Sequence, residues 1–243
     1  MRKPLLLVVA GANGAGKTTF IETQINFEEI PEEAYVCPDL IAEEIRRENP
    51  DLSEEEIYRR AMPMAEEIRY GKLEKGEDIV LETVFSSDEK LLFLEKALER
   101  GYEVNMVYVT TEDPRINAGR VAKRVILGGH PVPPDKIYSR YLRSLENLIT
   151  AHREGLLDRL LVADNTKEGQ PHRPYMAFEE GSLVWLDSSL KFTGKAIIPR
   201  HGEIPEHIKL LANQLLEVSP GEPKLREEVS LPPYMRKVRG LER

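Results

Sequence analysis

The chain has 243 residues, of which 41% are hydrophobic, and a formal net charge of −8. This length suits one large α/β domain with some chain left for an appendage, and the acidic balance argues against nucleic acid as the main partner. Cys37 is the only cysteine, which excludes an internal disulfide and a cysteine-based zinc cluster. The N-terminal apolar run is too short to cross a bilayer, so we expect a cytoplasmic protein with no membrane segment.

Residues 5–10 form an apolar run that predicts a strand buried on both faces. The next eight residues, GANGAGKT, fit the spacing G-x-x-x-x-G-K-[ST] of a phosphate-binding loop (P-loop) and lead into a predicted helix. In this spacing Lys17, expected to face solvent without ligand, reaches the β- and γ-phosphates, and the Thr18 hydroxyl binds Mg²⁺. The alternative is a tight glycine turn with a solvated lysine. The residues predicted to bind ATP or another nucleoside triphosphate are Gly11, Ala12, Asn13, Gly14, Ala15, Gly16, Lys17, Thr18 and Thr19.

A short apolar segment at 34–37 predicts a second strand, and a helical pattern follows from Leu40. Asp39 lies between them, at the carboxyl end of the strand, where parallel α/β sheets bind their ligands. Asp39 is therefore a candidate catalytic or substrate-binding carboxylate. Its position after Pro38 also suits a helix cap, and the two roles are compatible.

The segment from Leu40 to Tyr70 is predicted to be a helical insertion between two strands. A capping box at 53–56 starts its second helix, and Pro63 is expected to kink that helix. An insertion at this place is suited to cover a phosphoryl acceptor.

Residues 79–85 predict the third buried strand, which Glu82 interrupts with a charge that an apolar core disfavours. A carboxylate after three apolar residues suggests a second Mg²⁺ ligand beside Thr18. The alternative is a solvent-facing glutamate at the end of a strand.

After a predicted helix at 88–100 and a strand at 103–109, residues 114–152 predict two helices separated by Gly128-Gly129 and three prolines. Between residues 114 and 143 this segment has seven basic residues against one acidic residue. Polyphosphate would compensate such a charge, and the glycines suggest a flexible hinge, so we interpret 114–152 as a lid. A merely solvated basic face is the alternative. The candidate catalytic arginines are Arg120, Arg124 and Arg140.

A last core strand at 160–165 ends in Asp164 and Asn165, which are candidates to border the purine. The elements predict an α/β P-loop NTPase fold of the nucleotide-kinase kind, with three layers and a mostly parallel five-stranded sheet over residues 1–166. Residues 167–243 are expected to form an appendage with a β-hairpin, one helix and a charged, proline-rich tail.

Residues 1 to about 166 resemble the zeta-toxin family of P-loop kinases. The resemblance depends on the loop, on Asp39, on Leu81-Glu82-Thr83, and above all on RVAKRV at 120–125 followed by GGHPVP at 128–133 and Arg140-Tyr141. It implies a kinase in which Asp39 activates the acceptor hydroxyl, Glu82 and Thr83 lie at the substrate, and lid arginines hold the transferring phosphate. In characterised zeta toxins the acceptor is a uridine-diphosphate-linked N-acetyl amino sugar, and a small antitoxin blocks the nucleotide site.

Two functions follow from these observations. The first is a Mg²⁺-dependent kinase that phosphorylates a hydroxyl of a small metabolite, with an antitoxin-like protein as a possible partner. The second is an NTP-hydrolysing switch or ATPase that acts through a protein partner and has no acceptor.

Overall fold

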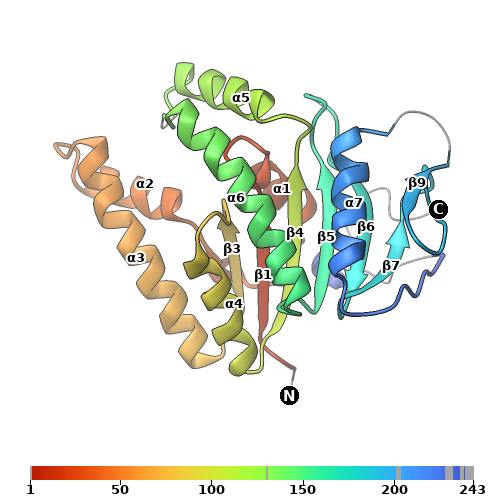
Figure 1. Ribbon diagram of the computed structural model, residues 1–243. Coiled ribbons are helices and arrows are strands. Elements are labelled where there is room, and N and C mark those ends of the chain that lie inside the picture. The colour runs from red at the N-terminus through yellow and green to blue at the C-terminus, as the bar shows by residue number, and fades with distance from the viewer. Residues whose placement is uncertain (1, 130, 201–203, 228–231, 236–237, 239–243) are drawn as a thin grey trace.

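The computed structural model describes residues 2–129, 131–200, 204–227, 232–235 and 238. Over these residues a seven-stranded sheet, in the order β2-β3-β1-β4-β5-β6-β7, lies between two layers, and a two-stranded sheet of β8 and β9 lies to one side (Figure 1). The strands are β1 (Leu5–Ala10), β2 (Tyr35–Val36), β3 (Ile79–Thr83), β4 (Glu103–Thr110), β5 (Arg159–Asp164), β6 (Arg173–Glu179), β7 (Ser182–Leu186), β8 (Leu190–Phe192) and β9 (Ile197–Pro199).

The helices alternate with the first five strands, which is the pattern that the sequence predicts for an α/β fold. The predicted class and its three layers are confirmed. None of the described helices is long and apolar enough to span a bilayer. The helices are α1 (Lys17–Gln24), α2 (Pro38–Glu48), α3 (Glu54–Lys75), α4 (Asp88–Glu99), α5 (Pro114–Ile126), α6 (Pro134–Arg153) and α7 (Glu206–Val218), with single 3₁₀ turns η1 (Glu32–Ala34) and η2 (Pro233–Met235).

Strands β1 to β5 pair in parallel with β1 near the centre, and all six residues of β1 are buried. The apolar runs of these strands are buried because helices cover both faces of the sheet. Parallel pairing brings the carboxyl ends of the strands to one edge, which is the edge that carries the P-loop.

The predicted number of five strands is wrong, because the hairpin of β6 and β7 joins the same sheet. β6 pairs antiparallel with β5 from Arg159↔Glu179 to Asp164↔Arg173, and β7 pairs with β6. The hairpin satisfies backbone groups that would otherwise be exposed along β5.

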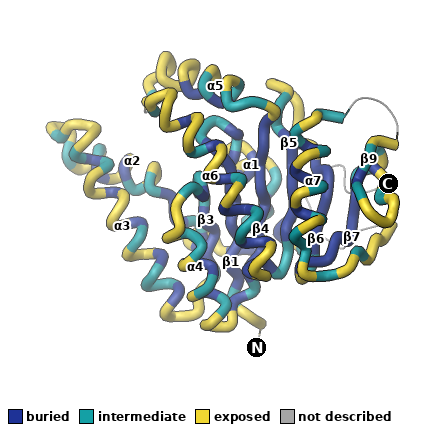
Figure 2. Tube along the Cα trace, in the orientation of Figure 1, coloured by how far each residue is buried: buried dark blue, intermediate teal, exposed yellow. Residues whose placement is uncertain are grey.

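The strands at the centre of the molecule are largely buried (Figure 2). The two faces of the sheet have separate apolar cores. One face is covered by α4, α6 and α7, and the other by α1 and the C-terminal turn η2. The insertion of α2 and α3 has a small core of its own, with Ala42, Ile45, Ile57 and Ala61. Helix α3 runs through Pro63 without interruption and extends beyond the predicted segment, to Lys75.

Candidate active site

The P-loop connects β1 to α1 at the carboxyl edge of the sheet. Helix α1 begins at Lys17, directly after Gly16, whose φ of 96° places it in the left-handed region. The unpaired N–H groups and the positive dipole end of α1 therefore face the loop, which favours an anion there.

Two glycines of the loop lie where no side chain fits. A Cβ on Gly11 would lie 2.2 Å from the carbonyl oxygen of Val109 in β4, and a Cβ on Gly14 would lie 2.6 Å from that of Asn117 in α5. The loop is thus packed directly against a strand and against the first half of the predicted lid.

Side chains from outside the loop hold its carbonyl groups. The sequence gives no local signal for these contacts, because the partners lie between 104 and 156 residues apart. Asn117 and His172 were not predicted as site residues. Asn117 donates to the oxygen of Asn13 (2.9 Å), Arg120 to Gly14 (3.4 Å), Asn165 to Ala15 (2.7 Å) and His172 to Gly16 (3.0 Å).

Lys17 is buried, with 7% of its surface exposed, so the expectation of a solvent-facing lysine is wrong. Its ammonium folds back and donates to the carbonyl oxygen of Ala12 at 3.1 Å. Burial lowers the pKa of Lys17 and the charge of Arg124 lowers it further, whereas the carboxylates of Glu82 and Asp39 raise it. Charged groups from three other elements therefore act on this ammonium.

Thr18 and Glu82 are neighbours, as expected of two ligands of one ion. The Thr18 hydroxyl donates to Oε1 of Glu82 at 2.9 Å, and the Tyr35 hydroxyl donates to Oε2 at 2.9 Å. Burial and the adjacent carboxylate raise the pKa of Tyr35, so the phenol stays protonated and orients Glu82. The set combines hydroxyl and carboxylate oxygens, which are the ligands that Mg²⁺ prefers.

Asp39 is the second residue of α2 and lines the same cleft as the P-loop. Its Oδ1 accepts a hydrogen bond of 3.0 Å from the hydroxyl of Tyr58 in α3. Burial and the Asp39 carboxylate raise the pKa of Tyr58 to about 12. Tyr58 is a donor that the sequence did not identify, because only the packing of α3 on α2 brings it to Asp39.

Thr83 also lines the cleft, and its hydroxyl accepts a hydrogen bond from the N–H of Phe85 at 3.0 Å. Phe85 has a φ of 57°, which is strained for a residue with a large side chain. Asn147 of α6 donates to the Phe85 carbonyl at 3.2 Å. Strand β3 therefore ends at Thr83, two residues earlier than predicted, in a braced turn.

The predicted lid arginines occupy different positions. Arg124 and Arg140 line the cleft. Arg120 also borders it, but its guanidinium donates to the carbonyl oxygens of Asn165 at 2.7 Å and Thr166 at 3.3 Å. Arg120 thus ties α5 to the segment after β5.

Helix α5 ends in a defined cap at the two glycines that the sequence suggests as a hinge. The N–H of Gly128 donates to Val125 at 3.0 Å and that of Gly129 donates to Arg124 at 2.9 Å. With Gly128 at a φ of 90°, this is a Schellman motif. His130, which follows in the sequence motif, lies outside the described residues.

The P-loop, the α2–α3 insertion, helices α5 and α6, and the segment 165–172 surround one open cleft of about 1960 Å³. A site for one small ligand measures roughly 300–1,000 Å³. The cleft therefore has room for a nucleotide and for a second ligand beside Asp39.

Of the two candidate purine neighbours, Asp164 and Asn165, only Asn165 lies at the cleft. Asp164 is buried and accepts hydrogen bonds from Thr166 at 2.6 Å and from His207 of α7 at 3.0 Å, so its carboxylate connects the sheet to the C-terminal helix.

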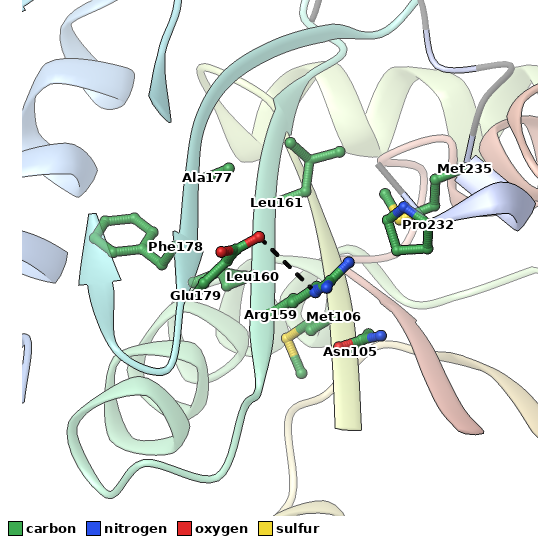
Figure 3. A pocket seen from close by; sticks show the side chains of 10 residues that line it. All are labelled: Asn105, Met106, Arg159, Leu160, Leu161, Ala177, Phe178, Glu179, Pro232 and Met235. Carbon is green, nitrogen blue, oxygen red and sulfur yellow. Dashed lines mark ion pairs between the residues drawn. The ribbon is translucent and has the colours of Figure 1, made fainter. Parts of the chain in front are cut away.

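A second pocket lies at the opposite, amino-terminal edge of the parallel strands (Figure 3). Met106, Leu160, Phe178 and other apolar groups line it, and Arg159 and Glu179 form an ion pair of 3.9 Å there. Its volume of about 30 Å³ holds no more than a water molecule. Nucleotide chemistry therefore belongs to the large cleft.

Comparison with known proteins identifies the fold and the family. The family model for zeta toxin matches residues 1–173. No curated protein matches the chain. A structure of the PezAT chromosomal toxin–antitoxin system of Streptococcus pneumoniae is 17% identical, with a TM-score of 0.50, and the match covers 68% of this chain and 69% of that chain.

A structure of AvrRxo1-ORF1:AvrRxo1-ORF2 with sulphate ions is 14% identical, with a TM-score of 0.60, and the match covers 91% of this chain and 78% of that chain. The structure of the same pair with ATP gives 13% identity and a TM-score of 0.59, with coverage of 89% and 77%. At these identities the likeness concerns the fold, and it extends beyond residue 173. Because the family model covers more than half of the chain, this protein belongs to the zeta toxin family of P-loop kinases and is a phosphotransferase.

Proposed function

We propose that this protein is a Mg²⁺-dependent kinase that transfers the γ-phosphate of ATP to a hydroxyl group of a small metabolite. The position of Lys17, Glu82, Asp39 and Arg124 around one cleft carries the proposal. Phosphoryl transfer needs cations beside the phosphates and a carboxylate near the acceptor hydroxyl, and this arrangement offers both. The size of the cleft supports a second ligand beside the nucleotide.

The roles follow from position. The loop N–H groups and Lys17 bind the phosphates, while Arg124 and Arg140 stabilise the charge of the transferring group. Asp39 accepts the proton of the acceptor hydroxyl as the new O–P bond forms. The Tyr58 hydroxyl donates a hydrogen bond of 3.0 Å to Oδ1 of Asp39 and so orients the carboxylate.

Thr18 and Glu82 would hold Mg²⁺, because their oxygens lie 2.9 Å apart beside the P-loop. A site that shares its ion with phosphate oxygens and water needs few protein ligands. Accordingly, the described residues contain no cluster of three or more acidic, histidine or cysteine side chains that could hold a metal alone. The bound ion supplies charge neutralisation for the phosphates.

For the acceptor, we propose a nucleotide-activated sugar, with a uridine-diphosphate-linked N-acetyl amino sugar as the first candidate because of the family. An antitoxin-like partner and a cytoplasmic location are part of the same proposal. The similar PezAT structure belongs to a toxin–antitoxin system, which supports such a partner.

The decisive experiment follows the label from γ-³²P-ATP in the presence of Mg²⁺ and a panel of uridine-diphosphate sugars, nucleosides and small alcohols. A kinase transfers the label to an organic acceptor. Release of inorganic phosphate alone, across the whole panel, would favour the switch or ATPase.

With an acceptor in hand, Asp39→Asn should lower the turnover number by about a hundredfold or more, because the general base is lost while ATP still binds. Glu43→Gln is the matched control. Glu43 lies one helical turn after Asp39 in α2 and lines the same cleft, and its substitution by glutamine also removes one negative charge. Equal turnover in Asp39→Asn and the parent would refute the base assignment.

A further inference from the structure

We infer that Asn165 and His172, here called the outer pair, are positioning residues that hold the P-loop in its phosphate-binding form. Both lie in the segment after β5, far along the chain from the loop. Asn165 Nδ2 donates to the carbonyl oxygen of Ala15 at 2.7 Å, and His172 Nε2 donates to that of Gly16 at 3.0 Å. A carbonyl oxygen only accepts, so the His172 proton is on Nε2.

The direction of these two carbonyls fixes the direction of two amides. In a trans peptide the C=O of one residue and the N–H of the next point to opposite sides. Holding the oxygens of Ala15 and Gly16 toward the outer pair therefore aims the N–H groups of Gly16 and Lys17 toward the other side, where phosphate binds. Without these donors the Ala15–Gly16 peptide plane loses the hydrogen bond from Asn165, and the Gly16–Lys17 plane keeps only the bond from the Phe20 N–H to the Gly16 oxygen at 3.0 Å. An anion must then order the loosened loop as it binds.

The outer pair is packed tightly against the loop. A Cβ on Gly16 would lie 2.2 Å from Nδ2 of Asn165 and 3.2 Å from Nε2 of His172. His172 is only 7% exposed and its ring meets that of Phe20 in α1 edge to face, with centroids 5.3 Å apart. The glycine before the P-loop lysine is thus required by its neighbours as well as by its positive φ.

The outer pair is itself anchored. Arg120 of α5 donates to the carbonyl oxygen of Asn165 at 2.7 Å, which fixes the backbone that carries the Asn165 amide. A purely structural role for the pair would change stability without a specific effect on phosphate. A positioning role acts on the affinity for the polyphosphate group.

The inference rests on the proposed function only in taking the loop as a polyphosphate site. The test is calorimetric titration of inorganic tripolyphosphate, with thermal unfolding measured in parallel. His172→Ala and Asn165→Ala should each bind tripolyphosphate about tenfold more weakly, which is the effect of losing one buried hydrogen bond. His172→Gln should stay within about threefold of the parent, because the glutamine Nε2 can donate in place of the ring nitrogen.

Parent-like affinity in both alanine variants overturns the inference, and so does an equal loss in His172→Ala and His172→Gln. Where an alanine variant shows no cooperative unfolding, Asn165→Leu decides, since it keeps about the size of the side chain and removes the donor without adding a charge. Parent-like tripolyphosphate binding by Asn165→Leu also overturns the inference. The probe needs no acceptor and no turnover, so failure of the kinase proposal would leave this result unchanged.

Discussion

Gly129 offers a way to move Arg124, a proposed catalytic arginine, without mutating it. A Cβ on Gly129 would lie 2.6 Å from Cγ and 3.2 Å from Cδ of Arg124. Ordinary contact between carbon atoms begins near 3.4 Å, so Gly129→Ala should displace the Arg124 side chain by about 0.8 Å. Gly129 has no left-handed φ, so an alanine suits the backbone conformation there. The same Cβ would also lie 3.0 Å from the carbonyl oxygen of Arg124, which requires a small shift of a few tenths of an ångström.

The matched control is Gly128→Ala. A Cβ on Gly128 meets nothing within 4 Å, but the φ of 90° penalises any side chain. Gly128→Ala should therefore cost about 1 to 2 kcal/mol of stability at the end of α5 and leave the Arg124 side chain in place. The two neighbouring substitutions thus separate backbone strain from displacement of the arginine.

A misplacement of about 1 Å at a reacting centre can cost a hundredfold in rate. We expect Gly129→Ala to lower the turnover number by about ten- to a hundredfold, with a smaller change in the affinity for ATP. Steady-state kinetics with saturating Mg-ATP, together with thermal unfolding, measures both effects. If Gly129→Ala turns over within twofold of the parent, or if Gly128→Ala is the slower enzyme, Arg124 is not held by this contact.

Lys17→Ala should abolish productive ATP binding. The unfolding temperature should stay unchanged or rise slightly, because burying the ammonium costs desolvation energy in the parent. Wild-type turnover in this variant would exclude the P-loop role. Arg124→Ala and Arg140→Ala should lower the turnover number by about a hundredfold and the ATP affinity less, and a purely salt-dependent loss of affinity would instead indicate electrostatic attraction of the nucleotide. Burial lowers the pKa of His152 from 6.5 to about 4 in the folded protein. As the pH falls, His152 is therefore protonated in the unfolded chain before it is protonated in the folded protein. About 3 kcal/mol of stability should be lost between pH 6.5 and pH 4. His152→Gln should flatten that part of the stability curve in pH-dependent denaturant titrations, and an unchanged curve would contradict the assignment.

Local patterns predicted the elements that depend on local physics. The apolar runs of β1, β3, β4 and β5 predicted strands buried on both faces, and the glycine spacing predicted the P-loop between β1 and α1. The likeness to zeta toxins also came from short motifs with fixed spacing, and the family model confirms it.

The parts that could not be predicted depend on contacts between distant segments. Tyr58 reaches Asp39 through the packing of α3 on α2, and His172 reaches Gly16 from 156 residues away. The burial of Lys17 has the same cause, since a motif gives the type of a residue but not the neighbours that enclose it. The hairpin of β6 and β7 was recognised from its local pattern. Its pairing with β5 was not predicted, because it is a contact between separate segments.

That pairing bears on where the protein can be divided. The family model ends at residue 173, where β6 begins. A fragment cut there would leave β5 as an open edge strand and would remove α7, whose Ile208, Leu211 and Leu215 cover the apolar face of the sheet. We expect such a fragment to aggregate, because it would combine an unpaired strand with exposed core residues. The segment by which the family is recognised is therefore shorter than the segment that folds, and the C-terminal residues belong to the scaffold of the kinase.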